Sequence, residues 1–310
     1  MVQKYISSLM VLGLGVAAAF SNDLHTRLSG PSRGRKILPT GDDGGWRRRS
    51  SGAERAEAVR LARIQQDVEE GLVNDFEAAA VARIGGPKAA TYGEITRKGM
   101  ATLATRLGLG PVRQPCLAHY LSMYSAPCLT TATTSRQDSH FADLGSGCGR
   151  AVFQAAEDFG VASACGVELA PSRHARALAL LDHAPPDITR RVEFFCGDVA
   201  SDAVWAADGP LQRTTDVWLC SLCFDAALLE ALALRISASE TVQRVATLKP
   251  FSCVRSSGVD SESLDESGLC GFHEEVKEPC EMSWSVGLLV ASAETEWTHP
   301  GVPVHIYTRN

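Results

Sequence analysis

The hydrophobic positions beyond residue 140 form two alternating kinds of run, and this alternation predicts an α/β domain. Short apolar runs favour buried strands, and longer runs with apolar residues at helical spacing favour helices. The predicted strands are 140–145, 162–169, 192–199, 216–224 and 242–251, and the predicted helices are 152–160, 172–184 and 226–236. Such alternation is typical of a largely parallel sheet. Two last runs, 281–292 and 302–310, are predicted to close the sheet as antiparallel strands.

The chain before residue 140 predicts a small helical lobe. Residues 53–84 carry apolar side chains at roughly helical intervals, namely Val59, Leu61, Ile64, Val68 and Leu72. After a loop, a second helix is expected to begin near Ile95 and to stop at Gly108 and Gly110. Residues 111–135 are rich in Pro, Ser and Thr and look like an insertion.

The first 55 residues differ in composition from the rest. Residues 1–22 place Lys4 before an apolar stretch that ends in small residues, which is a signal-peptide pattern, although a short buried or interfacial helix is the alternative. Residues 23–55 are basic and rich in Ser, Gly and Pro, so they cannot bury a core. Together they resemble a plastid-targeting leader. A nuclear-import or nucleic-acid patch at 47–49, or a linker without a role, are the other interpretations.

These patterns divide the chain into four parts. We expect a targeting segment at 1–22, a basic linker at 23–55, a helical lobe with an insertion at 56–140, and the main α/β domain at 141–310. No apolar run is long enough to cross a bilayer, so no membrane domain is expected.

Charge and cysteine content narrow the function classes. The formal net charge of −6 argues against a broad cationic face that grips nucleic acid, and a basic substrate would suit this chain better. Of the ten cysteines, only Cys220 and Cys223 form a CxxC pair, and no second pair stands at metal-ligand spacing. We therefore expect no metal site and a reducing compartment.

A glycine-rich turn follows the first predicted strand of the main domain. Asp143 ends the strand, and Gly145, Gly147 and Gly149 lead into the next helix. Glycine lets the backbone adopt positive φ and approach a ligand closely. A nicotinamide dinucleotide fold would need GxGxxG, whereas position 150 is arginine, and the spacing here is GxGxG.

Two acidic residues strengthen this interpretation. Glu168 ends the second strand, where a carboxylate can accept both hydroxyls of a ribose. Asp198 follows the third strand, where a carboxylate can accept a hydrogen bond from an adenine amino group. Because ligands of open α/β sheets bind at the carboxyl ends of the strands, the three strand ends predict one adenosyl-binding crevice. Singly, either acid could be a turn residue or a helix N-cap.

At this point the sequence is similar to a known family. YGEI at 92–95, FADLGSGCGRAVFQAA at 141–156, ACGVEL at 164–169, LKPF at 248–251 and the terminal MSW and VPVHIY runs together resemble the disruptor-of-telomeric-silencing (Dot-type) histone lysine methyltransferases, over about residues 88–310. The resemblance implies a class I, Rossmann-like methyltransferase fold with a mostly parallel sheet and an antiparallel C-terminal strand, preceded by the helical lobe. It also implies S-adenosyl-L-methionine as cofactor, and a nuclear chromatin protein that acts on histones of the nucleosome.

The resemblance also assigns site residues. It implies that Tyr92 and Glu94 belong to a loop that closes over the methionine end of the cofactor. It implies that the cofactor is further held by Asp143, Gly145, Gly147, Gln154, Glu168 and Asp198. The implied catalytic residues, which align or surround the acceptor lysine, are Tyr92, Cys220, Phe224 and Trp284, with Trp297 as the alternative to Trp284.

Departures from the family pattern keep the acceptor open. The family carries an Asn-Asn-Phe run whose amide helps to place the methyl group, but here Cys220 and Ser221 stand before Leu222. Val199 replaces an aromatic residue that stacks on adenine. The leading hypothesis is a protein lysine methyltransferase that acts on a histone surface. The alternatives are a methyltransferase of non-histone proteins or small molecules, supported by the leader, and a cofactor-binding homologue with weak catalysis.

Overall fold

The computed structural model describes residues 52–109, 138–252, 268–285 and 301–310. The expectations for the leader, for most of the basic linker, for the insertion and for Trp297 lie outside these residues. No helix among the described residues is long and apolar enough to cross a membrane.

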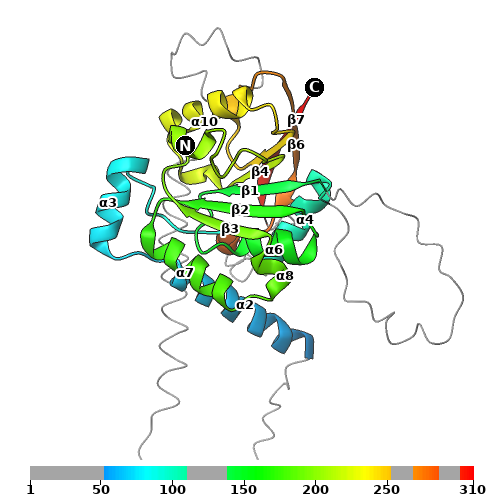
Figure 1. Cartoon of the computed structure of the whole chain (residues 1–310). Helices are drawn as coiled ribbons and strands as arrows, with labels where there is room; N and C mark the ends of the chain where they lie inside the picture. The colour runs from blue at the N-terminus through cyan, green and yellow to red at the C-terminus, as the bar shows by residue number, and fades with distance from the viewer. Residues whose placement is uncertain (1–51, 110–137, 253–267, 286–300) are drawn as a thin grey trace, which may run out of the picture.

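A seven-stranded sheet forms the centre of the molecule (Figure 1). Its strands follow the order β3-β2-β1-β4-β5-β7-β6. β1 to β5 run parallel, and β7 is antiparallel both to β5 and to β6. The bounds are β1 His140–Leu144, β2 Ser163–Glu168, β3 Val192–Cys196, β4 Asp216–Leu219, β5 Arg244–Thr247, β6 Phe272–Cys280 and β7 Val302–Arg309. This arrangement confirms the predicted class I methyltransferase fold.

Helices cover both faces of the sheet, because successive side chains of each buried strand point to opposite faces. Phe141 and Trp218 join one hydrophobic cluster together with residues of α4, α6 and α8. Ala142 and Val217, their neighbours along the strands, join the other cluster with residues of α10. The helices that follow β1 are α6 Arg150–Asp158, α7 Pro171–Asp182, α8 Pro186–Thr189, α9 Asp202–Trp205 and α10 Ala226–Ala238.

The predicted helices before residue 110 are present as α2 Gly52–Glu70, α3 Asp75–Gly85 and α4 Arg97–Leu107. The break between α2 and α3 is fixed by Asn74, whose side chain caps α3 by accepting from the Glu77 N–H. α4 begins at the Thr96 cap and ends at Gly108, which takes the left-handed conformation at φ +62°. α4 is buried in the core of the sheet domain, whereas α2 and α3 lie at its periphery (Figure 1).

Two predictions for the strands were wrong. The predicted fourth strand runs to residue 224, but β4 ends at Leu219, and the CxxC region turns into the 3₁₀ helix η1 Ser221–Cys223. Residues 281–285 form a bridge and a helical turn rather than a strand, and the rest of the predicted run to 292 lies outside the described residues. The true partner of β7 is β6, whose sequence FHEEVKEPC lacks apolar alternation because β6 is an edge strand.

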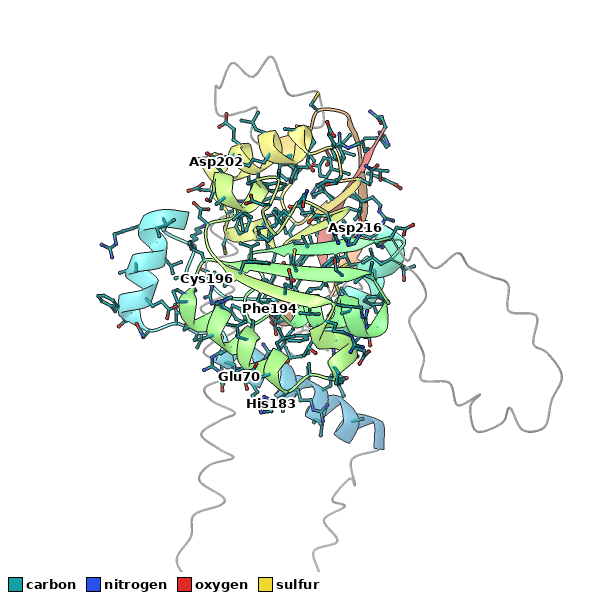
Figure 2. All side chains as sticks on the ribbon, in the orientation of Figure 1. Glu70, His183, Phe194, Cys196, Asp202 and Asp216 are labelled. Atoms are coloured by element: carbon teal, nitrogen blue, oxygen red, sulfur yellow. The ribbon has the colours of Figure 1, made fainter. Side chains whose placement is uncertain are left out.

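The carboxyl ends of the parallel strands meet at one edge of the sheet. In Figure 2, Cys196 marks this edge as the last residue of β3, while Asp216 marks the opposite edge as the first residue of β4. The glycine turn after β1 and Glu168 at the end of β2 therefore lie at the Cys196 edge.

Candidate active site

The glycine turn connects β1 to α6. Gly145, Gly147 and Gly149 all have positive φ, at +88°, +56° and +82°. The N–H groups of Gly145 and Ser146 both donate to the carbonyl oxygen of Val167, at 2.9 and 3.1 Å, which holds the turn against β2. A Cβ at Gly147 would lie 2.6 Å from the Tyr92 ring, so the turn requires glycine there both for its conformation and for its space.

Glu168 locks this turn to the second strand. Its carboxylate is 5% exposed and accepts from the Gly147 N–H at 2.8 Å and from the Ala170 N–H at 2.9 Å. The Arg173 guanidinium lies 3.7 Å away. The predicted ribose-binding residue therefore stands beside the glycine turn and is held in place by backbone donors on both sides.

Asp143 is a buried carboxyl group with spare acceptor capacity. It is 4% exposed, and its Oδ1 atom has no hydrogen-bond partner among the described residues. Burial raises the pKa of Asp143 well above its ordinary value, and the charges of Glu168 and Glu94 raise it further. A buried acceptor without a partner is costly, so this atom indicates a ligand with a donor group.

The Tyr92 to Glu94 loop covers the glycine turn. The Tyr92 hydroxyl donates to Glu94 at 2.7 Å, and the Cys148 N–H lies 3.5 Å from the same hydroxyl. The Arg173 guanidinium stands over the Tyr92 ring at 4.8 Å. Burial raises the pKa of Tyr92 and that of Glu94. The loop thus places a second, partly buried carboxyl group near Asp143.

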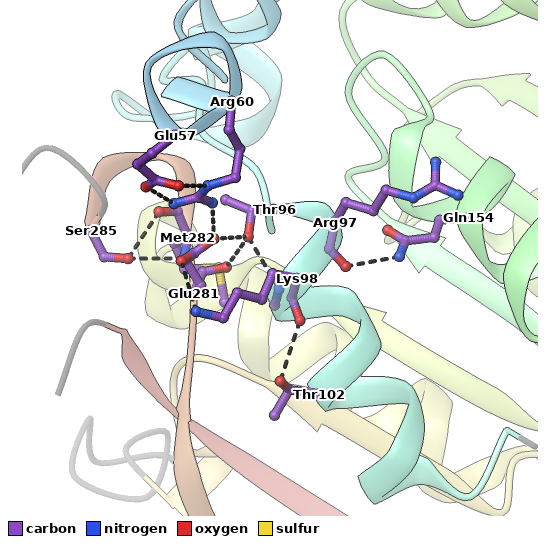
Figure 3. Close-up of polar contacts among 11 residues, drawn as sticks. Glu57, Arg60, Thr96, Arg97, Lys98, Thr102, Gln154, Glu281, Met282 and Ser285 are labelled. Carbon is purple, nitrogen blue, oxygen red and sulfur yellow. Dashed lines mark hydrogen bonds and ion pairs between the residues drawn. The ribbon is translucent and has the colours of Figure 1, made fainter. Parts of the chain in front are cut away.

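A short antiparallel contact holds this loop to the segment after β6. The Glu94 N–H donates to the Ser283 hydroxyl at 3.1 Å, and the Ser283 N–H donates to the Glu94 carbonyl at 2.9 Å. Below it, the buried Glu281 accepts from Thr96 and from Arg60, both at 2.7 Å (Figure 3). α2, α4 and the segment after β6 therefore meet directly behind the loop.

The predicted catalytic residues meet on the side of β4. The Cys220 thiol donates to the Gly93 carbonyl at 3.6 Å, and burial raises the pKa of this thiol. The Phe224 ring lies over Gly145, 3.2 Å from where a Cβ would stand. The Trp284 ring contacts Gly93. Cys220, Phe224 and Trp284 thus surround the junction of the loop and the glycine turn with uncharged side chains.

Two predicted site residues lie apart from this cluster. The Gln154 amide donates to the Arg97 carbonyl at 2.8 Å, so its side chain joins α6 to α4 (Figure 3). Asp198 stands after β3, where its carboxylate accepts from the Ala200 N–H at 2.9 Å. Val199 is buried in the core rather than turned to the outside.

Two arginines, Arg150 and Arg173, also belong to the site although neither was predicted. Arg150 begins α6 and pairs with Asp67, Glu70 and Glu94 at 3.0, 2.8 and 3.4 Å. The missing third glycine of a dinucleotide turn was the available signal at position 150, although it could not reveal partners 80 residues away in sequence. No group of three potential metal ligands is found within the described ranges.

Comparisons with known proteins agree with this site. The family model of histone methylation protein DOT1 matches residues 126–286, just over half of the chain. No curated protein matches the sequence. A solved RNA methyltransferase from Salinibacter ruber in complex with S-adenosyl-L-homocysteine is similar at 24% identity and a TM-score of 0.28, over 36% of this chain and 65% of that one. This chain therefore spans just under two thirds of that protein.

A second solved structure covers more of the chain. A SAM-dependent methyltransferase from Geobacter sulfurreducens, also in complex with S-adenosyl-L-homocysteine, is similar at 13% identity and a TM-score of 0.36, over 74% of this chain and 98% of that one. The strand order and the glycine turn, rather than these overall likenesses, define the fold.

The matched segment contains most of the site. It includes the glycine turn, Glu168, Asp198 and the β4 side of the cluster, while α2, α3 and the Tyr92 loop lie before it. The chain therefore belongs to the DOT1 histone methylation family, and it is a methyltransferase whose cofactor is S-adenosylmethionine.

Proposed function

We propose that this protein methylates a lysine side chain of a protein, and that its acceptor is a histone on the nucleosome. The observation that carries the proposal is the match of the DOT1 histone methylation family over residues 126–286. This segment contains the glycine turn, Glu168 and Asp198. The net charge of −6 is also suited to a basic acceptor protein.

The described residues fit the cofactor. S-adenosylmethionine carries an ammonium group and a sulfonium, and supplies an electrophilic methyl group when bound. Asp143 offers an unpartnered buried acceptor, and Glu94 is a second acid beside it. A cationic ligand would relieve the repulsion between these acids, since opposite charge favours the ionised carboxylate. The turn at Gly145 and Gly147 has room only because it lacks Cβ atoms.

Each residue has a distinct task in this proposal. Tyr92, Glu94 and Asp143 hold the methionine end, and Gly145 and Gly147 let the backbone approach the ligand. Glu168 holds the ribose and Asp198 the adenine. Gln154, which the family resemblance includes, supports the site from behind through the α4 contact.

The acceptor side favours a neutral amine. Cys220, Phe224 and Trp284 carry no charge, and burial in an apolar channel lowers the pKa of a lysine. A neutral amine would then form a C–N bond with the methyl group as the S–C bond breaks, S-adenosylhomocysteine would leave, and the proton of the new ammonium would pass to solvent. The main task of these side chains would be alignment. No strong base is needed for this step.

Label transfer tests the acceptor. The purified full chain is incubated with S-adenosylmethionine labelled in the methyl group and with nucleosomes, total RNA or a small-molecule extract. Label on histone lysine supports the proposal, and the Glu168→Ala variant should transfer none. Label on RNA or small molecules but not on histones would overturn the choice of acceptor and leave the methyltransferase assignment intact.

One observation favours a second candidate, a cofactor-binding protein with weak catalysis. The Ser221 hydroxyl is fully buried and bonds to Thr247 at 2.6 Å and to the Lys249 N–H at 2.8 Å. It is thus turned away from the site and does not replace the family's amide. Calorimetric cofactor binding without turnover on any of the three acceptor pools would favour this candidate.

The proposal places the protein in the nucleus, where nucleosomes are found. The basic residues between positions 27 and 55 would supply contacts to nucleic acid that the acidic body does not offer. A reporter fusion found exclusively in plastids would contradict this location and favour a non-histone acceptor.

A further inference from the structure

Arg150, the first residue of α6, is surrounded by three carboxylates, which together with it form the Arg150 cluster. Its guanidinium lies 3.0 Å from Asp67 and 2.8 Å from Glu70, both on α2, and 3.4 Å from Glu94. It also reaches the carbonyl oxygen of Asp67 at 3.4 Å. A planar guanidinium with several donors can bridge carboxylates from different elements, as it does here between α2 and the loop.

The Arg150 cluster lies directly beside the predicted cofactor contacts. Glu94, which Arg150 contacts, also accepts the Tyr92 hydroxyl, and Tyr92 in turn packs on Gly147 of the glycine turn. The Arg150 side chain is 22% exposed and that of Glu94 is 17% exposed, so solvent screens this contact less than a surface ion pair. The position of Glu94 over the turn therefore depends on a charge that comes from α6.

We propose that Arg150 is a positioning residue: held by Asp67 and Glu70 of α2, it keeps Glu94 ionised and in place to bind the cationic end of the cofactor. The inference rests on the proposed function, since it concerns the same site. It also gives α2, which lies before the segment matched by the family model, a part in cofactor binding.

The charges around Glu94 explain why Arg150 is needed. Burial raises the pKa of Glu94, and so does the nearby Asp67, whereas Arg150 and the Tyr92 hydroxyl lower it. Asp143, Cys148 and Cys220 also lie within electrostatic reach of Glu94. Without Arg150, nothing cationic among these groups would oppose burial, and Glu94 would tend to take up a proton and lose the charge that attracts the cofactor.

α2 contributes through orientation rather than contact with the ligand. Asp67 and Glu70 compensate the charge of Arg150 and hold its guanidinium towards the loop. About two turns earlier in the same helix, Arg60 pairs with the buried Glu281 at 2.7 Å, in the segment that follows β6 (Figure 3). α2 thus braces both ends of the loop that runs from Tyr92 to Thr96.

The test is calorimetric binding of S-adenosylhomocysteine and S-adenosylmethionine to the full chain at about pH 6 and about pH 8. For Arg150→Gln we expect affinity for S-adenosylmethionine to fall roughly tenfold at pH 8, since the partly buried ion pair between Arg150 and Glu94 is lost. The loss should be larger at pH 6 than at pH 8, because Glu94 without Arg150 takes up a proton more readily at the lower pH. Arg150→Lys keeps the charge but cannot bridge the same carboxylates, so its affinity should lie between those of wild type and Arg150→Gln.

Four further variants make the result specific. Arg97→Gln is the matched control, because Arg97 pairs with Glu157 and Asp158 of α6 outside the site, and it should bind as wild type does. The double variant Glu94→Gln with Arg150→Gln should show the same pH dependence of cofactor affinity as Glu94→Gln alone, because Arg150 is proposed to act through Glu94. The double variant Asp67→Asn with Glu70→Gln leaves Arg150 present and should still weaken binding, which separates orientation by α2 from charge.

Amide hydrogen exchange of the ligand-free chain gives an independent readout. The Glu94 and Ser283 amides should exchange faster in Arg150→Gln than in Arg97→Gln. Wild-type affinity and pH profile in a folded Arg150→Gln variant, or unchanged loop exchange, would overturn the inference. If Arg150→Gln does not fold, the double variant on α2 decides in the same way. Failure of the wild-type chain itself to bind the cofactor would instead overturn the proposed function.

Discussion

The two halves of the active site are held together by different kinds of interaction. The cofactor half, at the ends of β1 and β2, gathers Asp143, Glu168 and Glu94. Backbone donors and Arg173 hold Glu168, and Arg150 holds Glu94. The acceptor half, beside β4, contains Cys220, Phe224 and Trp284, which meet by packing against Gly93 and Gly145. Charge and backbone geometry define the first half, and shape defines the second.

This difference indicates which half tolerates change. A buried carboxylate with two backbone donors cannot be replaced without stranding those donors. An uncharged wall can change its side chains and keep its shape, as the replacement of the family's amide by Cys220 illustrates. We therefore expect substitutions in the cofactor half to weaken cofactor binding and substitutions in the acceptor half to change turnover. The following predictions test this contrast.

Glu168→Ala should have the largest effect. It leaves the Gly147 and Ala170 N–H groups without their acceptor, so we expect a loss of about 2–4 kcal/mol in the free energy of unfolding and of about 100-fold in cofactor affinity. Denaturant unfolding and calorimetry measure the two effects. Glu193→Ala, an exposed carboxylate on β3, is the control and should change neither.

Gly147→Ala should come next. The added Cβ meets the Tyr92 ring at 2.6 Å, and φ at +56° is unfavourable for alanine, so we expect a cost of about 1–3 kcal/mol and cofactor affinity lowered by about tenfold or more. Gly52→Ala is the matched control, since nothing lies within 4 Å of its Cβ position. Equal melting temperatures for the two variants would show that the turn is not held by Tyr92.

Asp143→Asn should separate stability from binding. Because the pKa of Asp143 is raised in the folded state, the folded chain holds a proton that the unfolded chain has already lost, and the stability of the ligand-free protein falls as the pH rises through this window. Asparagine does not ionise, so the stability of the variant does not fall with rising pH for this reason. We expect the variant to melt about 2–4 °C higher at neutral pH, which corresponds to about 1 kcal/mol, and to bind the cofactor far more weakly.

The raised pKa of Asp143 also predicts proton release on binding. A cationic ligand lowers the pKa of Asp143, so wild-type binding should release protons at any pH where Asp143 is protonated in the ligand-free chain, as seen when calorimetry is repeated in buffers with different ionisation enthalpies. An unchanged binding enthalpy across buffers would contradict a role for Asp143 in the ligand contact.

Cys220→Ser should have the smallest effect. A hydroxyl can still donate to the Gly93 carbonyl, so cofactor affinity should match wild type and turnover should change by at most about threefold. Cys270→Ser, at an exposed position, is the control for thiol loss. A large drop in cofactor affinity would break the contrast between the halves, because it would make the acceptor side part of the cofactor site.

The local parts of the site could be predicted from the sequence. The GxGxG spacing after a strand, with an acid at the end of the next strand, predicted the turn and an adenosyl-binding crevice, because these contacts involve the backbone and its near neighbours. The family resemblance then implied S-adenosylmethionine. The start of α4 near Ile95 and its stop at Gly108 were likewise predicted, since helix ends depend on residues within one turn.

Only the tertiary structure decided the remainder. β6 has no apolar alternation to reveal it, because an edge strand is recognised by its partner β7 and not by its own pattern. Gln154 shares a helix with Arg150, yet the first turns to α4 and the second to the site. α2 contacts Glu281 through Arg60 and is linked to Glu94 through Arg150. These residues are far apart in sequence, so their contacts are visible only in the folded chain.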